Sequence, residues 1–147
     1  RDAAQAGGTA GLPVSGFVAE LYDGSTHSQD ARDFAFADAA RIAFRAMLDT
    51  VGTTILEPVM RVSVRTASQF TGPVIGDLSS RRGRIESMDS QNMDSLVCAL
   101  VPLAEMFGYV GDLRSLTQGR AGYTMEPAGY EPCPANVEAR VRAELGR

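Results

Sequence analysis

Apolar and polar side chains alternate strictly from residue 60 to residue 65. Met60, Val62 and Val64 are apolar, and arginine or serine follows each of them. Because successive side chains of a strand point to opposite faces, this period of two predicts a strand with one buried face. Three further strands are expected, at Arg84–Met88, Leu96–Val101 and Arg120–Glu126, with a polar loop at Asp89–Ser95.

Two segments between these strands have helical spacing instead. Val74, Ile75 and Leu78 predict a short helix that stops at Gly83. The second helix is expected where apolar residues recur at helical spacing, at Leu103, Met106, Phe107, Val110 and Leu113. The order strand-helix-strand-strand-helix-strand predicts an α+β fold, a ferredoxin-like βαββαβ sandwich of four antiparallel strands with two helices on one face.

Other residues are expected in the core or at the ends of this sandwich. The expected core residues, besides those of the helices, are Met60, Met88, Met106, Met125, Ala121, Tyr123 and Cys98. Pro127–Pro134 should end the last strand, since proline removes a donor from the sheet. Val137, Val141 and Leu145 then recur at intervals of four, which predicts a terminal helix at Asn136–Leu145.

The first 55 residues show a less regular pattern. Leu12–Tyr22 predicts a strand, and Asp23–Ser25 is typical of a turn. Asp30 is expected to cap a helix that has Asp33 in its first turn, where a negative charge interacts favourably with the helix dipole and stabilises the helix. The apolar stripe of that helix is Phe34, Phe36, Ala40, Ala43, Phe44 and Met47.

Charge and composition exclude several classes of function. The net charge of −4 and pI near 4.9 argue against general, sequence-blind nucleic-acid binding, which needs a broad basic face, so any RNA binding would have to rest on local sites. Cys98 and Cys133 share no metal-ligand spacing, so no metal site is expected. The apolar run Leu96–Leu103 is too short to span a bilayer, and we expect an intracellular, cytoplasmic protein with reduced thiols and no membrane partner.

Catalytic motifs are absent from the sequence. There is no GxxxxGK[ST] phosphate loop, and all 14 basic residues are arginine, so no lysine exists to build one. His27 is the only histidine and lies in a turn-like segment, which does not supply the buried setting that a catalytic base needs. We expect neither catalytic nor nucleotide-binding residues in this chain.

Four segments together resemble the end of bacterial elongation factor G, the translational GTPase that drives translocation. The strongest is LAEMFGYVGDLRSLTQGRAGYTM at Leu103–Met125. LEPVMRVSV (Leu56–Val64) and GPVIGDLSSRRGRIESM (Gly72–Met88) resemble the start of the last domain of that family. YDGSTHSQDARDFAFADAARIAFRAM (Tyr22–Met47) resembles the tip loop and following helix of the preceding domain.

The resemblance implies a C-terminal fragment in three parts. Residues 1–55 would be the end of domain IV, a partial domain of the ribosomal protein S5 domain 2-like type; residues 56–130 would be ferredoxin-like domain V; residues 131–147 would be a helical extension. The implied function is to support GTP-dependent translocation of tRNA and mRNA on the ribosome. GTP and Mg would be cofactors of the missing GTPase domain only, and the chain would act as a monomer without DNA.

Two sets of residues are implied to face RNA. The first matches the family's tip loop at the decoding centre: Ser25, Thr26, His27, Ser28 and Gln29. Beside it, Asp30-Ala31-Arg32-Asp33 stands where the family usually has Asp-Ser-Ser-Glu. The second set is Arg81, Arg82 and Arg84, a possible rRNA contact. Compensation of a helix dipole explains Arg81 and Arg82 equally well, with Arg84 at an exposed strand start.

Other functions stay open on the sequence. A ribosome-protection GTPase or a specialised paralogue would share these segments but reshape the tip loop. A free-standing ferredoxin-like module is the alternative from another class, either RNA-binding or a small-molecule sensor. The lack of aromatic residues in Met60–Val64 and Leu96–Val101 counts against an RNA-recognition module, which stacks bases on its central strands.

Overall fold

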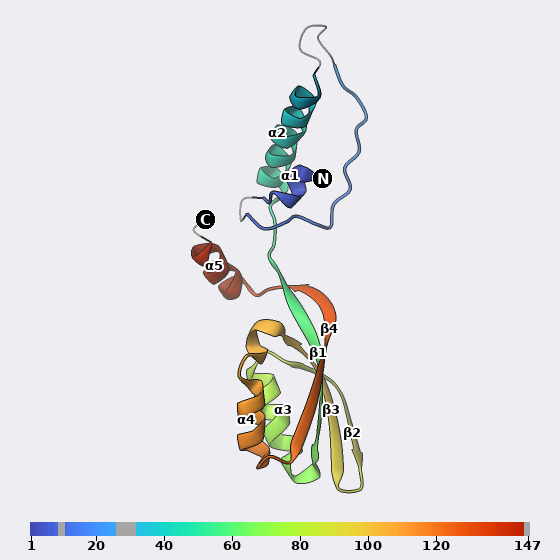
Figure 1. Ribbon diagram of the computed structural model, residues 1–147, viewed down its shortest axis with the longest axis vertical. Helices are drawn as coiled ribbons and strands as arrows, with labels where there is room; N and C mark the ends of the chain where they lie inside the picture. The colour runs from blue at the N-terminus through green and yellow to red at the C-terminus, as the bar shows by residue number, and fades with distance from the viewer. Residues whose placement is uncertain (9–10, 26–31, 146–147) are drawn as a thin grey trace. The chain divides into compact units, whose positions relative to one another are not determined.

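The computed structural model describes residues 1–8, 11–25 and 32–145 of the chain (Figure 1). It divides into two compact units. Unit 1 comprises residues 1–55 and 134–147, and unit 2 comprises residues 56–133. None of the helices in these described ranges combines the length and apolar character that crossing a bilayer requires.

Unit 2 is a four-stranded antiparallel sheet in the order β2-β3-β1-β4. The strands are β1 (Leu56–Ala67), β2 (Arg84–Gln91), β3 (Asp94–Pro102) and β4 (Ala121–Pro132). Helices α3 (Thr71–Ser80) and α4 (Tyr109–Thr117) lie side by side on one face of this sheet (Figure 1). The α+β class and the ferredoxin-like βαββαβ topology expected from the sequence are therefore confirmed.

The core of unit 2 lies between the helices and the inward faces of β1 and β3. Its buried members are Met60, Val62, Val64, Val74, Leu78, Val97, Ala99, Val101, Met106, Tyr109 and Leu113. The alternation in β1 and the helical spacing in α3 predicted this packing directly. The rings of Tyr109 and Tyr123 meet edge to face with centroids 5.0 Å apart, so Tyr123 joins the core as expected.

The expected second helix is wrong at its beginning. Leu103–Met106 forms a separate 3₁₀ turn, and α4 begins only at Tyr109. Gly108 has φ +79°, a left-handed conformation that interrupts the helical register. Phe107 consequently turns outward and is 78% exposed, while Tyr109 takes the buried place.

Three other core predictions are also wrong. Met88 and Met125 are exposed; they lie on β2 and β4, the two edge strands of the sheet, which have a neighbouring strand on one side only. Cys98 faces the opposite side of the sheet, where its Sγ lies 3.5 Å from the hydroxyl oxygen of Ser63. Period-two alternation in β3 places Cys98 between the inward residues Val97 and Ala99.

The strands also extend further than the sequence indicated. Residues 89–95 are not a loop, since β2 and β3 pair up to Gln91 and Asp94, and Asn92 turns the chain at φ +58°. Likewise β4 does not end at Pro127 but pairs with the beginning of β1 up to Pro132. β4 is an edge strand of the sheet, which is where strands tolerate proline.

Unit 1 contains three helices in its described residues: α1 (Asp2–Gln5), α2 (Asp33–Val51) and α5 (Ala135–Glu144). Gly7 follows α1 and Gly52 follows α2, both with positive φ, the conformation that ends a helix. The helix predicted at Asn136–Leu145 is α5, whose Arg142 donates a 3.0 Å hydrogen bond to the carbonyl oxygen of Thr53. Asp33 is in the first turn of α2, as expected.

One expectation for unit 1 is wrong, and another falls on a residue that the structure does not describe. Leu12–Tyr22 is not a strand, since no strand of the described residues pairs with it; its Phe17 packs on Phe44 of α2 instead, with ring centroids 5.2 Å apart. The N-cap position of α2 is Arg32, without a side-chain cap, and Asp30 lies outside the described residues. Phe34 and Phe36 in the first turns of α2 are exposed.

Candidate functional site

The predicted tip loop lies almost entirely outside the described residues. Only Ser25 is described, and it is exposed. Thr26, His27, Ser28 and Gln29 are not described. Just before them, the backbone N–H of Gly24 donates a 2.7 Å hydrogen bond to Oδ1 of Asp23, which is local turn chemistry of the kind that the sequence indicated.

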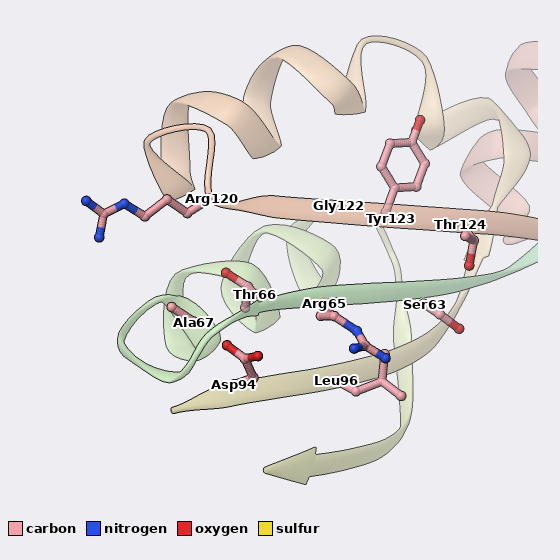
Figure 2. Close-up of a pocket in the computed structure, with 10 residues that line it drawn as sticks. All are labelled: Ser63, Arg65, Thr66, Ala67, Asp94, Leu96, Arg120, Gly122, Tyr123 and Thr124. Atoms are coloured by element: carbon pink, nitrogen blue, oxygen red, sulfur yellow. The ribbon is translucent and has the colours of Figure 1, made fainter. Parts of the chain in front are cut away.

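A shallow groove of about 690 Å³ lies on unit 2, at the end of the sheet formed by the end of β1 and the beginnings of β3 and β4 (Figure 2). Arg65 is at its centre, and its cross-strand neighbours are Leu96 on β3 and Gly122 on β4. Two residues earlier on the same face of β1, Ser63 lies between Cys98 of β3 and Thr124 of β4. The full lining is Ser63, Arg65, Thr66, Ala67, Asp94, Leu96, Arg120, Gly122, Tyr123 and Thr124.

The side chains of the lining divide between the two faces of the sheet. Arg65, Ser63 and Thr124 point away from the helices, whereas the ring of Tyr123 points toward them (Figure 2). Gly122 leaves open space, since a Cβ added there would meet no atom within 4 Å. The outward side of the groove thus carries the Arg65 guanidinium and the hydroxyls of Ser63 and Thr124, set in a lining that is otherwise largely apolar.

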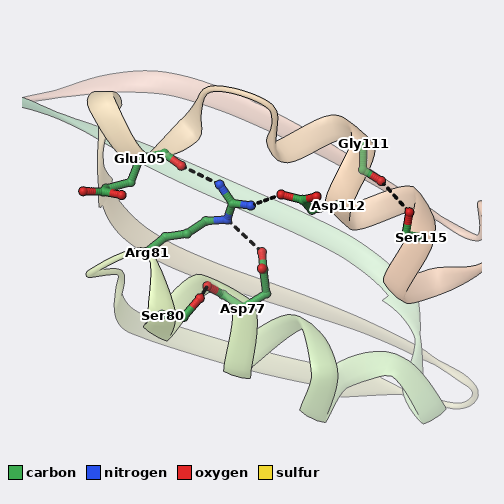
Figure 3. A network of polar contacts seen from close by, with 7 residues as sticks. All are labelled: Asp77, Ser80, Arg81, Glu105, Gly111, Asp112 and Ser115. Atoms are coloured by element: carbon green, nitrogen blue, oxygen red, sulfur yellow. Dashed lines mark hydrogen bonds and ion pairs between the residues drawn. The ribbon is translucent and has the colours of Figure 1, made fainter.

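The arginines predicted as a site form ion pairs at and just after the end of α3, and Figure 3 shows those of Arg81. Arg81 donates to Oδ2 of Asp77 at 2.9 Å, to the carbonyl oxygen of Glu105 at 2.6 Å and to Oδ2 of Asp112. Its guanidinium also lies 5.1 Å from the ring centroid of Tyr109. Burial opposes the charge of Arg81, but the two aspartates outweigh it and raise its pKa.

Arg82 ties the same helix end to the beginning of β1. It forms a bidentate pair with Glu57, at 2.7 and 2.8 Å, and a 3.1 Å bond to Oε1 of Glu105. The hydrogen bond from Arg82 to Glu57 raises the pKa of Arg82. The Arg82 backbone is left-handed at φ +60°, and the N–H of Gly83 closes the helix by donating to the carbonyl oxygen of Leu78 at 2.8 Å.

Arg84 is the most exposed member of the three, with 64% of its side chain accessible. It pairs with Glu131 of β4 at 2.9 Å. Each of the three predicted arginines is therefore neutralised by one or more carboxylates of the same unit. Compensation of the helix dipole, the simpler explanation from the sequence, does not account for these ion pairs, because the acidic partners of the arginines come from several different elements.

Sequence reasoning missed Arg65 and Arg120, which border the groove. Neither forms an ion pair in the described part of the chain, whereas Arg61 on the same face is paired with Glu86 and Glu126. The signal was present in the sequence: Arg65 is an outward position of the alternating strand. No group of three or more His, Cys, Asp or Glu side chains among the described residues is arranged to hold a metal ion.

Two family models match successive parts of the chain. A family model described as "Elongation factor G C-terminus" matches residues 54–141, and one described as "Elongation factor G, domain IV" matches residues 1–52. The chain belongs to the elongation factor G family. It carries the C-terminal part of such a factor, in the order that the sequence segments indicated.

Individual relatives agree with this assignment. Elongation factor G of Ehrlichia ruminantium (strain Welgevonden) is 48% identical over 130 residues, which cover 88% of this chain and 19% of the relative. Elongation factor G of Anaplasma marginale (strain Florida) is 48% identical over 133 residues, covering 90% and 19% respectively. The chain thus spans about a fifth of the length of these curated relatives.

A solved structure supports the fold of this elongation factor G chain. The crystal structure of a protein from Thermus thermophilus matches with a TM-score of 0.88 and 39% sequence identity. The match covers 99% of this chain and 22% of the other. The family's C-terminal model overlies the ferredoxin-like unit, so the arginine cluster and the groove both lie in that part of the factor.

Proposed function

We propose that this chain is the ribosome-contacting C-terminal portion of a translation factor and supports GTP-dependent translocation of tRNA and mRNA. The observation that carries the proposal is the pair of adjacent family matches, domain IV followed by the C-terminal domain, along one chain. GTP and Mg²⁺ would be bound by the GTPase part of a longer factor. This chain would contribute shape and RNA contacts, without bond chemistry of its own.

The tip loop is the element that we assign to the decoding centre. Ser25–Gln29 offers hydroxyl, imidazole and amide groups in five consecutive residues, the kinds of group that hydrogen-bond to or stack on unpaired nucleotides. Its location in the sequence just before α2 favours this role, because a rigid helix can position a loop that acts at a distance. Its effect on translocation would be steric, through occupation of the space that a tRNA leaves.

We further propose that the arginine cluster contributes to the fold first and to rRNA binding second. Arg81 and Arg82 are largely buried by their ion pairs, and a phosphate could replace those partners only by leaving carboxylates without a counter-charge. Arg84 is available for rRNA because its pair with Glu131 is exposed, and exposed pairs contribute at most about 1 kcal/mol.

The remaining partners follow from the same proposal. The chain would work in the cytoplasm as a monomer, with the ribosome, tRNA and mRNA as partners. A ribosome-protection factor or a specialised paralogue is the alternative within the family, and the His27-containing tip favours the translocase. A free-standing module is disfavoured, because the domain IV model matches the residues that precede the ferredoxin-like unit.

Competition on the ribosome tests the proposal. The purified 147-residue chain is mixed with vacant 70S ribosomes and sedimented, with and without an intact elongation factor G held in its GTP state by a non-hydrolysable analogue. The chain should pellet with ribosomes and be displaced by the intact factor. The variant Leu78→Asp, which places a charge in the core of unit 2, serves as the unfolded control. Absence of binding, or binding that the intact factor does not reduce, would contradict the proposal.

A further inference from the structure

We propose that the groove around Arg65 and Arg120 is a phosphate-binding site that contacts the RNA backbone. The inference rests on the proposed function, since that function brings the chain to the ribosome, and it names a contact that the sequence did not indicate. The main RNA contact of unit 2 would then lie on the sheet face opposite the helices, and not at Arg81, Arg82 and Arg84.

The first support is the local geometry of the sheet. Arg65 projects outward from the central strand β1, between Leu96 on one side and Gly122 on the other. Since Gly122 has no side chain and open space above it, a ligand can approach Arg65 from the β4 side down to the backbone. Ser63 and Thr124 form the neighbouring cross-strand pair on the same face, and their hydroxyls can donate to phosphate oxygens.

The second support is the distribution of charge. Arg61, Arg81, Arg82 and Arg84 of unit 2 are each paired with one or two acidic side chains of the same unit. Arg65 and Arg120 are not paired with any described acidic residue, although both border one groove. The guanidinium fork binds phosphate bidentately, and Arg65 lies in the middle of the lining while Arg120 projects from its end, so the two would contact successive phosphates of one backbone rather than a single anion (Figure 2). The lining contains a single acidic residue, Asp94, which leaves the groove net positive.

The same surface favours an RNA backbone over a protein partner. A protein interface needs aromatic or methionine anchors at its centre, and the lining that the described residues form contains no methionine; its apolar side chains are Ala67, Leu96 and Tyr123. Tyr123 is turned toward the helices, so no aromatic ring of the described lining is presented for base stacking (Figure 2). Contacts would therefore go to phosphates, and binding would depend little on base sequence.

Fluorescence anisotropy of the full chain tests the site. The probes are a fluorescein-labelled single-stranded RNA of about 20 mixed nucleotides, long enough to offer several phosphates, and, in parallel, unlabelled purified 70S ribosomes added to the chain carrying a fluorescein label at its N-terminus. Arg65→Gln and Arg120→Gln should each weaken binding to both probes by about fivefold, the loss of one exposed charge-assisted contact. Each should also lower the slope of log K against log salt by about 0.7, the value for one phosphate of a single strand.

Three further variants separate a phosphate site from general electrostatics. Arg114→Gln is the matched control, because Arg114 is an exposed arginine on α4, outside the groove and without an ion pair in the described residues; it should change neither affinity nor slope. Asp94→Asn should tighten binding, since it removes the one negative charge of the lining. Gly122→Glu should abolish binding at the site without unfolding the sheet, because its Cβ meets no neighbour.

The outcomes distinguish this site from the proposed function. If the chain binds ribosomes and all these variants bind as the parent chain does, the groove is not the site, although the proposed function stands. Equal losses for Arg114→Gln and Arg65→Gln would reduce the effect to overall charge and overturn the site. Competition by poly-glutamate as strong as competition by unlabelled RNA would indicate an acidic protein partner and overturn the RNA assignment. A chain that binds neither ribosomes nor RNA would contradict both.

Discussion

Leu78→Ala should be among the most destabilising single truncations in unit 2. The Leu78 side chain has no solvent exposure and lies between α3 and the sheet. Burial of a leucine side chain contributes roughly 1.5–3 kcal/mol, and the cavity left by alanine adds to this loss. Gly83 packs against the Leu78 carbonyl, so the helix end has little freedom to close the cavity. We therefore expect a loss of about 3–5 kcal/mol, in the upper part of the usual range for leucine-to-alanine changes.

Urea unfolding measures this loss, with Phe107→Ala as the control. The chain has no tryptophan, and the packed pair Tyr109–Tyr123 gives unit 2 its own near-ultraviolet circular dichroism signal. Phe107→Ala removes a larger side chain but should change the unfolding free energy by less than about 0.5 kcal/mol, because the ring is mostly exposed. Equal losses for the two variants would refute the assignment of Phe107 to the surface and with it the break at Gly108.

Four other outcomes are expected. Gly83→Ala should cost about 1–3 kcal/mol, because the added Cβ would collide with the carbonyl oxygen of Leu78; unchanged urea unfolding would contradict this. Tyr109→Phe should leave stability at pH 7 unchanged or raise it by about 1 kcal/mol, since the buried hydroxyl has no hydrogen-bond partner in the described residues. Burial, and secondarily Asp77, raises the pKa of Tyr109 in the folded chain, so this tyrosine ionises at lower pH in the unfolded chain. The parent chain should therefore lose stability above about pH 10. The Phe variant should lose less, and urea midpoints measured across that pH range check this. In a full-length factor, His27→Ala should slow single-round translocation with GTP hydrolysis nearly intact, and normal translocation would remove the residue from the RNA-facing set. Amide exchange should be slower in unit 2 than in unit 1, whose helix α2 has only one buried side chain; uniform protection across both units would contradict this.

The parts of the fold that could be predicted from the sequence are those in which a periodic pattern has one explanation. The alternation Met60, Val62, Val64 leaves a single choice of buried face, and α3 is followed by a glycine within a few residues. The topology followed from the order of such elements. The family resemblance added the domain order, which no periodicity contains.

The parts that could not be predicted depend on backbone conformation or on partners far along the chain. Phe107 fits a helical stripe, and only the left-handed Gly108 shows that the stripe is broken. Asn92 closes a hairpin within a segment that has the composition of a polar loop. Arg82 and Glu57 are 25 residues apart, so their ion pair depends on the finished fold. For the same reason the sequence could not separate neutralised arginines from the unpaired Arg65.

The central claim is tested most directly by a chimeric factor. The C-terminal fifth of elongation factor G from Ehrlichia ruminantium, 48% identical to this chain, is replaced by the chain itself. Single-round translocation and GTP hydrolysis are then measured on the same preparation of ribosomes. Our account predicts that the chimera translocates at a rate close to that of the intact factor. A chimera that is folded and hydrolyses GTP, but moves neither tRNA nor mRNA, would contradict it.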